Sequence, residues 1–384
     1  MNTAQPTLQI ALTPGTIDLA WGHPATDLLP VAAMKRASAA ALVKFGTDAL
    51  TYGYPAGPGP LLEWLAQRIG QREGRTPASD EIMITGGNSL GLDQLLTLWT
   101  KPGDIMLVES PTYHLAVRVM RDHPLNLLPV PADGEGLQVD ALAEILADLR
   151  KEGKRARMLY TVPTFHNPTG VSLSAPRRQA LVALAEREGL LIVEDDVYRE
   201  LSYDGPPPPS LWSQAPDGVV ARLGSFSKSL APGLRLGWLT ASKPIIKRIA
   251  DGGLLDSGGG INHFTALAVS LLCETGDYDT SVANFRTTYR ARRDALMGTL
   301  AQTLPKACSW YMPCGGFFAW VMLPEGIKSS ELLPRAEAAG VSFIPGKKFH
   351  LNGGGEHALR LAFSYYPPEK LIEAGQILGH VLHM

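Results

Sequence analysis

The sequence predicts an α/β fold in which a mostly parallel, seven-stranded-type central sheet carries helices on both faces, followed by a small α+β domain. Three observations predict it. Between Glu81 and Trp238, continuous apolar runs alternate with helical segments, which is typical of parallel strands buried on both faces. After about residue 283 the pattern changes to long helices and alternating, strand-like segments. A chain of 384 residues is long for a single core, so we expect one large and one smaller lobe.

The composition narrows the classes of partner. A net charge of −2 with intermixed acids and bases gives no electrostatic footprint for nucleic acid or an anionic membrane. No apolar stretch reaches the length of a bilayer span, and the N-terminus lacks a basic region followed by an apolar one, so we expect a cytoplasmic protein. Cys273, Cys308 and Cys314 have no metal-type spacing, so we expect reduced thiols and no metal. The expected partners are small molecules and a second copy of the chain.

The N-terminal part of the chain predicts an arm, a short apolar run and two helices. Residues 1–16 show little periodicity, which indicates a mobile arm. Ile17–Pro24 is an apolar run broken by glycine and proline. Leu28–Phe45 is rich in alanine with apolar residues at helical spacing, and Leu61–Glu73 has the same spacing, so both predict helices. The turn-rich loop Leu50–Gly59 lies between them.

The central sheet is predicted from six apolar runs and the helices between them. We expect strands over Ile82–Thr85, Ile105–Val108, Met158–Val162, Leu190–Glu194, Val219–Leu223 and Leu236–Thr240. We expect helices over a segment that runs to Trp99, over Leu137–Lys151 and over Pro176–Glu188. Ligands of such sheets bind outside the carboxyl ends of the strands, so the polar residues that follow these runs are candidates for a site.

The last third of the chain predicts the smaller lobe. The glycine-rich stretch Gly252–Gly260 precedes a long helix from about Thr265, and two interpretations of it stay open: a loop at the mouth of the site, or a hinge between domains. Beyond it we expect a long helix through Arg286–Leu304, alternating segments over Gly315–Val321 and Ala358–Phe363, and a final helix from Pro368.

One lysine stands out in the small-residue loop Gly224–Gly237, between two apolar runs. The serines and glycines of this loop, Ser225 among them, let backbone N–H groups and hydroxyls approach an anion, and Arg235 can add a forked contact to a phosphate. Lys228 would then lie beside that phosphate. A neighbouring cation and partial desolvation favour its neutral amine, which suits covalent catalysis through a Schiff base. An ordinary surface loop is the alternative.

Three further motifs favour the catalytic interpretation. Asn167-Pro168-Thr169-Gly170 follows one strand, Asp195 ends another with Tyr198 three residues later, and Thr85–Asp93 is a strand-to-helix turn. With the lysine loop, and in this order, they resemble the fold-type I enzymes that use pyridoxal 5'-phosphate (PLP). The closest resemblance is to the class I/II aminotransferases, in the branch with the 2-aminoadipate and kynurenine aminotransferases. It extends from about Ile17 to the C-terminus.

The resemblance implies the residues that act on the reactive part of PLP. Lys228 forms the Schiff base and then moves the proton between the substrate Cα and the cofactor. Asp195 pairs with the pyridine nitrogen and keeps it protonated, so that the ring can absorb electrons. Asp196 and Glu194 compete with Asp195 for this role, and the spacing to Tyr198 favours Asp195.

The resemblance also implies the residues around the ring. Asn167 and Tyr198 hydrogen-bond the phenolic oxygen, although Asn167 alone could be only a turn former. Tyr113 stacks on the pyridine, with a buried core tyrosine as the alternative. The residues implied on the phosphate are Gly87, Asn88 and Ser89 at a helix N-terminus, together with Ser225 and Arg235.

A second subunit is implied at the phosphate. In the family a tyrosine of the loop before the second helix reaches the phosphate of the other subunit. Tyr52 matches it, and Tyr54 is the competing position. The resemblance therefore implies a homodimer with shared active sites.

The substrate contacts follow from two segments. Arg360 lies in an apolar, alternating stretch where a buried guanidinium needs an anionic partner, and the resemblance gives it the substrate α-carboxylate, with Asn167 beside it; a structural salt bridge is the alternative. Trp21 and Gly22, with His23 as a weaker candidate, line the pocket. Relatives that handle dicarboxylates often carry an arginine in the N-terminal segment, and here none precedes Arg36. An aromatic or medium apolar amino acid is therefore at least as favoured.

The resemblance implies a function and a division into domains. We expect an aminotransferase of class EC 2.6.1 in amino-acid metabolism, which moves an amino group between an L-amino acid and a 2-oxo acid by a ping-pong cycle. A PLP-dependent β-lyase or decarboxylase is the alternative, and a PLP-sensing regulator is less favoured because the fold begins near residue 17. The expected domains are 1–45, which joins the small domain, 46–282, which binds PLP, and 283–384, the small domain.

Overall fold

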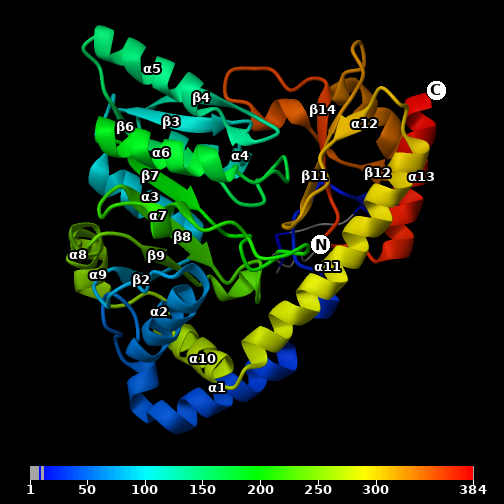
Figure 1. Cartoon of the computed structure of the whole chain (residues 1–384). Helices are drawn as coiled ribbons and strands as arrows, with labels where there is room; N and C mark the ends of the chain where they lie inside the picture. Colours follow the sequence, from blue (N-terminus) through cyan, green and yellow to red (C-terminus); the bar gives the residue numbers. More distant parts are fainter. Residues whose placement is uncertain (1–7, 10–12, 384) are drawn as a thin grey trace, which may run out of the picture.

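A central sheet of eight strands organises the larger part of the molecule (Figure 1). The computed structural model describes residues 8–9 and 13–383, so most of the predicted arm over residues 1–16 lies outside the described residues. In spatial order the strands are β2 (Ile82–Thr85), β9 (Gly237–Thr240), β8 (Val220–Ser225), β7 (Leu191–Asp195), β6 (Ala156–Thr161), β3 (Ile105–Ser110), β4 (Asn126–Asp133) and β5 (Gly136–Leu137). The pairs from β8 through β7, β6 and β3 to β4 are parallel, whereas β9 is antiparallel to both β2 and β8. The mostly parallel sheet is therefore confirmed.

The prediction missed β4 and the two-residue strand β5. β4 contains Pro129 and Pro131, and most of its side chains are partly or fully exposed. Proline cannot donate to a strand ladder and is found in edge strands. β4 pairs along its length only with β3, while β5 covers just its last two residues. An edge position explains why this strand lacks the apolar run that marks its neighbours.

Helices pack in groups around this sheet. Their bounds are α2 (Gly59–Glu73), α3 (Asn88–Trp99), α4 (His114–Arg121), α5 (Val139–Lys151), α6 (Ala175–Glu188), α7 (Leu211–Gln214), α8 (Lys243–Ala250), α9 (Gly253–Gly258) and α10 (His263–Glu274). α3 contacts α4 and α8, whereas α6 contacts α5 and α7. None of the helices in the described residues combines the length and the apolar character that a bilayer crossing needs.

The strand register decides which way the side chains at the end of β7 point. Tyr160 of β6 pairs with Val193, and Asp195 pairs with Leu223 of β8. Paired residues share a face of the sheet, as do residues two apart on one strand. Tyr160 and Asp195 therefore lie on one face, and Glu194 lies on the other.

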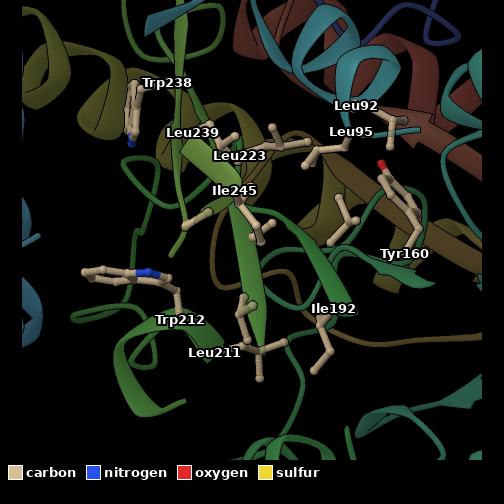
Figure 2. Close-up of a cluster of buried hydrophobic side chains, with 14 of the residues drawn as sticks. Leu92, Leu95, Tyr160, Ile192, Leu211, Trp212, Leu223, Trp238, Leu239 and Ile245 are labelled. Carbon is tan, nitrogen blue, oxygen red and sulfur yellow. The ribbon is translucent and has the colours of Figure 1, made fainter. Parts of the chain in front are cut away.

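Apolar side chains from the sheet and its helices form one large buried cluster (Figure 2). It includes Leu92 and Leu95 of α3, Tyr160 of β6 and Leu223 of β8, together with Trp212 of α7. Burial of each such side chain contributes about 1.5–3 kcal/mol. The strand ends that carry the polar motifs are thus fixed by a well-packed core.

The C-terminal part is a second, antiparallel layer. Its strands are, in spatial order, β10 (Ser309–Trp310), β11 (Phe318–Met322), β14 (Ala358–Ala362) and β13 (Ile344–Pro345). Its helices are α11 (Asp277–Thr303), α12 (Ser329–Ala338) and α13 (Pro368–His383). Figure 1 shows α11 in yellow, reaching from α10 to a packed pairing with α13. Residue 283 lies inside α11, and the division into domains stays a prediction.

The N-terminal segment crosses to this layer. β1 (Ile17–Asp18) pairs with β12 (Val341–Ser342), and the backbone N–H of Ala362 donates to the Leu19 carbonyl oxygen at 2.8 Å. α1 (Val31–Phe45) then leads back along α10. Between β1 and α1, the Ala20 carbonyl oxygen accepts a hydrogen bond from Arg360 of β14, and the Gly22 carbonyl oxygen accepts one from Lys228 in the loop after β8.

The glycine-rich stretch 252–260 differs from the predicted loop, because part of it is the helix α9. Its last residues contact the loop that carries Tyr52: the N–H of Gly260 donates to the carbonyl oxygen of Gly53 at 2.9 Å. A side chain on Gly259 or Gly260 would collide with the backbone of residues 53 and 54. These glycines therefore let the two backbones approach closely.

Candidate active site

The predicted site residues gather at the carboxyl ends of the parallel strands. β7 ends at Asp195, β8 ends at Ser225, and the chain beyond β6 turns at Asn167. α3 begins at Asn88, directly after β2. Because these strands are neighbours in the sheet, motifs far apart in the sequence meet at one edge.

Three consecutive acids lie at the end of β7, Glu194 and Asp195 within the strand and Asp196 directly after it, and their side chains have different partners. The Glu194 carboxylate accepts hydrogen bonds from the first two backbone N–H groups of α7, at 2.9 and 3.0 Å. The Asp196 carboxylate forms ion pairs with Arg199 and Arg222. Only Asp195 lies on the face that also carries Tyr160. The two competing acids are thus engaged elsewhere.

Asp195 is buried and receives two side-chain donors. Nδ2 of Asn88 lies 2.6 Å from Oδ1, and the hydroxyl of Tyr160 lies 2.7 Å from Oδ2. Burial raises the pKa of Asp195, while these two hydrogen bonds act in the opposite direction. Tyr160 was missed by the sequence reasoning because it lies within an apolar strand. The available signal was its hydroxyl, which needs a partner wherever the ring is buried.

The start of α3 forms a cradle with Arg235. Gly87 caps the helix with φ +86°, and a Cβ at this position would lie 2.9 Å from Nη2 of Arg235. The same Nη2 donates to the Gly86 carbonyl oxygen at 3.1 Å. Ser89 is exposed on the first turn, and Ser225 is buried, where its Oγ accepts from a backbone N–H. Free N–H groups at a helix N-terminus beside a guanidinium favour an anion.

Lys228 points to the N-terminal segment. Its Nζ donates to the carbonyl oxygen of Gly22 at 2.9 Å and lies 5.8 Å from the centre of the Phe317 ring. Burial lowers the pKa of Lys228 to about 8, and the charges of Arg360 and Arg235 act in the same direction. A lysine with this pKa has a substantial neutral fraction near neutral pH, as a nucleophilic amine requires.

Arg360 is buried without a counter-ion. Its guanidinium carbon lies 4.1 Å from the ring centre of Phe318 and 4.9 Å from that of Phe349. Nη1 donates to Oδ1 of Asn167 at 2.9 Å, Nη2 donates to the Ala20 carbonyl oxygen, and Nε has no hydrogen-bond partner. In the described part of the chain, no acid forms an ion pair with it, so the structural salt bridge is not seen there. Burial lowers the pKa of Arg360 to about 10.

Two tyrosines lie in the same region. Tyr198 is buried with its ring edge-on to Phe317 and Phe318, at centre distances of 5.5 and 5.8 Å, and burial raises its pKa well above the usual value. Tyr113 precedes α4, and burial followed by the charge of Asp195 raises its pKa. Both hydroxyls therefore stay protonated and can donate or accept hydrogen bonds.

The segment Trp21-Gly22-His23 closes over the lysine and the arginine. The rings of Trp21 and His23 lie 5.6 Å apart. Burial, with the charges of Lys228 and Arg360, lowers the pKa of His23 to about 4, so it is neutral near pH 7. A Cβ on Gly22 would lie 2.3 Å from the Phe318 ring, so glycine is needed for this close approach.

Tyr52 and Tyr54 are exposed to solvent. Tyr52 is 85% exposed and Tyr54 is 72% exposed. In the described residues, no hydrogen bond joins either hydroxyl to the groups above. The structure thus brings together the predicted residues of this chain except these two tyrosines.

The chain is similar to known proteins over nearly its whole length. The family model described as "Aminotransferase class I and II" matches residues 14–377. The "Aromatic-amino-acid aminotransferase 1" of Thermococcus litoralis is 36% identical over 98% of this chain and 90% of its own length.

Solved structures show the same similarity. The multiple substrate aminotransferase from Thermococcus profundus superposes with a TM-score of 0.92 at 36% identity, covering 97% of this chain and 92% of the other. The α-aminoadipate aminotransferase from Thermus thermophilus, complexed with N-(5'-phosphopyridoxyl)-L-leucine, gives a TM-score of 0.86 at 33% identity, covering 96% of this chain and 92% of the other.

Proposed function

The chain belongs to the class I and II aminotransferases, and from that membership we propose the residues that do the chemistry, the substrate class and the assembly that completes the site. It is a transferase of class EC 2.6.1 that moves an amino group between an amino acid and a 2-oxo acid, with PLP as its cofactor. When bound, PLP supplies an aldehyde for the amine and a ring that takes up the electrons left at the substrate Cα.

The residues around Lys228 fit this cofactor. The cradle of Gly87 and Arg235 offers free N–H groups and a cation to a phosphate. Asp195 lies on the face of the sheet turned to α3, with lone pairs left for a pyridine N–H. The amine of Lys228 has a pKa of about 8. These three features match the aldehyde, the phosphate and the ring nitrogen.

We assign the chemical steps accordingly. The neutral amine of Lys228 would hold the aldehyde carbon of PLP, and as a free amine it would move the proton at the substrate Cα. Asp195 would lie at the ring nitrogen as a carboxylate and keep that nitrogen protonated. Asn167 and Tyr198 would donate to the phenolic oxygen, and Tyr113 would stack on the ring.

For the phosphate we assign the groups around the start of α3. The residues from this chain are Gly87, Asn88, Ser89, Ser225 and Arg235. Gly87, Asn88 and Ser89 contribute backbone N–H groups. Asn88 uses only its backbone here, because its side-chain amide is already bonded to Asp195.

The observation that carries the proposal is the buried, unpaired guanidinium of Arg360. A buried charge without a partner is unfavourable, and a planar guanidinium binds a carboxylate with two parallel hydrogen bonds. Its Nε is without a partner, and Nη1 is oriented by Asn167. We therefore assign Arg360 to the substrate α-carboxylate, which places Cα near Lys228.

For the substrate side chain we propose an aromatic or medium apolar group. Of the cations near the site, Lys228, Arg235 and Arg360 each have a role above, and His23 is neutral. Trp21 and the Phe318 ring offer apolar surface. The aromatic aminotransferase of Thermococcus litoralis and the leucine adduct in the Thermus enzyme support this class.

A spectral titration tests this proposal. The PLP-loaded protein is mixed with single L-amino acids, and the cofactor's absorption is followed as it changes to the pyridoxamine form. Phenylalanine, tyrosine and leucine should convert it faster than aspartate or 2-aminoadipate. Conversion by dicarboxylates alone would overturn the substrate class. Release of carbon dioxide or of a β-substituent in place of pyridoxamine would favour the lyase or decarboxylase alternative.

We also propose a homodimer whose active sites are shared. Several large apolar side chains are exposed on this part of the chain. They are Val31 and Val43 of α1, Leu50 and Tyr52 just after it, and Leu254 of α9. Exposed apolar side chains that gather on one side of a protein mark an interaction site. A second copy of the chain would cover it and bring Tyr52 to the phosphate of the partner, with Tyr54 as the competing position.

For the compartment we propose the cytoplasm. Cys273, Cys308 and Cys314 are all free thiols. Unpaired thiols suit a reducing compartment. Alkylation of the protein in freshly lysed cells tests this, since all three should react as thiols once the chain is unfolded.

A further inference from the structure

The carboxylate of Asp195 is held by two side chains from different elements. The hydroxyl of Tyr160, on β6, lies 2.7 Å from Oδ2, and Nδ2 of Asn88, the first residue of α3, lies 2.6 Å from Oδ1. Nδ2 of Asn88 also lies 3.3 Å from the carbonyl oxygen of Leu223 on β8. The carboxylate is thus bonded directly to side chains of β6 and α3, and Asn88 in turn is bonded to β8.

Each oxygen of the carboxylate takes one of these donors. Rotation about the Cβ–Cγ bond would break both hydrogen bonds together, so the plane of the carboxylate is fixed. Hydrogen bonds to an ionised acceptor are shorter and stronger than neutral ones. Lone pairs remain on both oxygens for one further donor.

The position of Tyr160 shows what its hydroxyl does. The side chain is fully buried in the apolar cluster drawn in Figure 2, with Leu92 and Leu95 of α3 in the same cluster. A phenylalanine ring would fill nearly the same volume. The hydroxyl of a buried tyrosine is unfavourable unless it has a hydrogen-bond partner. Among the described residues, the hydroxyl's hydrogen-bond partner is Asp195. The tyrosine is therefore explained by that carboxylate and not by packing.

We propose that Tyr160 and Asn88 are positioning residues that orient Asp195 toward the cofactor's pyridine nitrogen and keep its carboxylate ionised despite burial. Neither touches the reacting atoms; both act through Asp195. This rests on the role proposed above for Asp195, and it adds to Asn88 a task beyond its backbone contact to phosphate. Other groups that interact with Asp195 are the backbone N–H of Val197 and the side chains of Tyr113, Tyr198, Asp196 and Lys228.

The first test is made on the cofactor-free protein. Asp195 is followed by carbon-13 NMR of labelled aspartate carboxyl groups, and its signal is identified by its loss in Asp195→Asn. Removal of the donor in Tyr160→Phe should raise the pKa of Asp195, because burial is then less compensated by hydrogen bonds to the carboxylate. The matched control is Tyr278→Phe, which removes a buried hydroxyl bonded to Ser229 in the same cluster. This control should leave the titration unchanged.

The second test measures the affinity for PLP. Tyr160→Phe should weaken PLP binding several-fold in the native background and hardly at all in the Asp195→Asn background, since the tyrosine acts through that carboxylate. Asn88→Ala should give the same pattern, and it carries the test if Tyr160→Phe does not fold.

The outcomes separate this inference from the function on which it rests. If Asp195→Asn itself leaves PLP affinity and absorption unchanged, the assignment of Asp195 is wrong. If Asp195→Asn has its effect but Tyr160→Phe titrates and binds as the native protein does, only the positioning role is overturned. The positioning role would also be overturned if Tyr160→Phe weakened PLP binding equally in both backgrounds, or if Tyr278→Phe shifted the Asp195 titration as much as Tyr160→Phe does. Either result would reflect packing.

Discussion

Lys228 is held in surroundings that disfavour its charge. Burial is the main cause, and the guanidinium groups of Arg360 and Arg235 add repulsion, while Asp195 opposes them. The pKa of about 8 lies below the usual 10.5. In the cofactor-free protein, protonated Lys228 is therefore a source of instability at neutral pH. The same property prepares the amine to react with an aldehyde.

The effect on stability has a definite pH window. The pKa of this lysine is about 8 in the folded protein and near 10.5 in the unfolded chain. Above pH 10.5 the lysine is neutral in both states and does not reduce the stability of the fold. As pH falls from 10.5 toward 8 the stability decreases, because the unfolded chain binds the proton first. Lys228→Met should therefore raise the Tm of the cofactor-free protein most at pH 7 and progressively less between pH 8 and 10.5. Thermal unfolding across this range measures it. A pH-independent change in Tm would show that the lysine is not destabilised by its charge.

At the scale of elements, one glycine lets Arg235 lie against the N-terminus of α3. Gly87 has φ +86°, and an added Cβ would lie 2.9 Å from Nη2 of Arg235. Gly103, in the turn after α3, also has φ +86°, but a Cβ there would meet nothing within 4 Å. The two glycines share a positive φ and differ in their surroundings.

This pair gives a controlled prediction. Because a strained backbone of positive φ costs an alanine roughly 1–3 kcal/mol, Gly87→Ala and Gly103→Ala should both lower the Tm of the cofactor-free protein. Only Gly87→Ala should also weaken PLP binding, on the order of tenfold, since it displaces Arg235 from the cradle. Calorimetry and equilibrium binding check the two effects. Equal PLP affinities in both variants would remove Gly87 and Arg235 from the phosphate site.

How far the sequence predicts these elements depends on burial. All six apolar runs became strands, because strands covered on both faces are apolar along their whole length. β4 escaped detection because an edge strand tolerates Pro129 and Pro131. The predicted helix through residues 286–304 begins earlier, at Asp277, directly after Gly276, which separates α11 from α10. Local pattern therefore finds buried elements better than edges and junctions.

The candidate site shows the same limit. Lys228, Asp195 and Arg360 could be named from motif order. The structure places Asp195 at the end of β7 and Lys228 just beyond β8, with Arg360 of β14, in the other sheet, close to Lys228. Tyr160 could not be named in this way, because its partner Asp195 is 35 positions away in the sequence and becomes a neighbour only through the pairing of β6 with β7. The strand register was also needed to show that Glu194 lies on the other face of the sheet. Spacing alone does not give the direction of a side chain at a strand end.

At the scale of the whole molecule, α1 presents one covered and one open side. Its buried residues are Ala33, Ala37 and Ala41, and the small side chains allow close packing on α10. Its outer side exposes Val43, at 87%, and the following loop exposes Tyr52. This surface is the one that we propose a second chain covers.

A hybrid experiment tests the shared site. Tyr52→Ala subunits are mixed with Lys228→Ala subunits, and exchange is confirmed by mass. If Tyr52 acts on the partner's site, each hybrid has one site with both lesions and one intact site, so activity should recover to about a quarter of native for random equal assortment. Activity equal to the mean of the two parents would mean that Tyr52 acts within its own chain or does not contact the cofactor.

The most direct measurement locates the covalent attachment of the cofactor. The PLP-loaded protein is reduced with borohydride, digested, and its peptides are examined by mass spectrometry, with Lys228→Met treated in parallel. The phosphopyridoxyl group should be found on Lys228 alone and should be absent from the variant. A modified peptide that contains another lysine, or equal labelling of the Lys228→Met protein, would contradict the assignment of Lys228 and the site built around it.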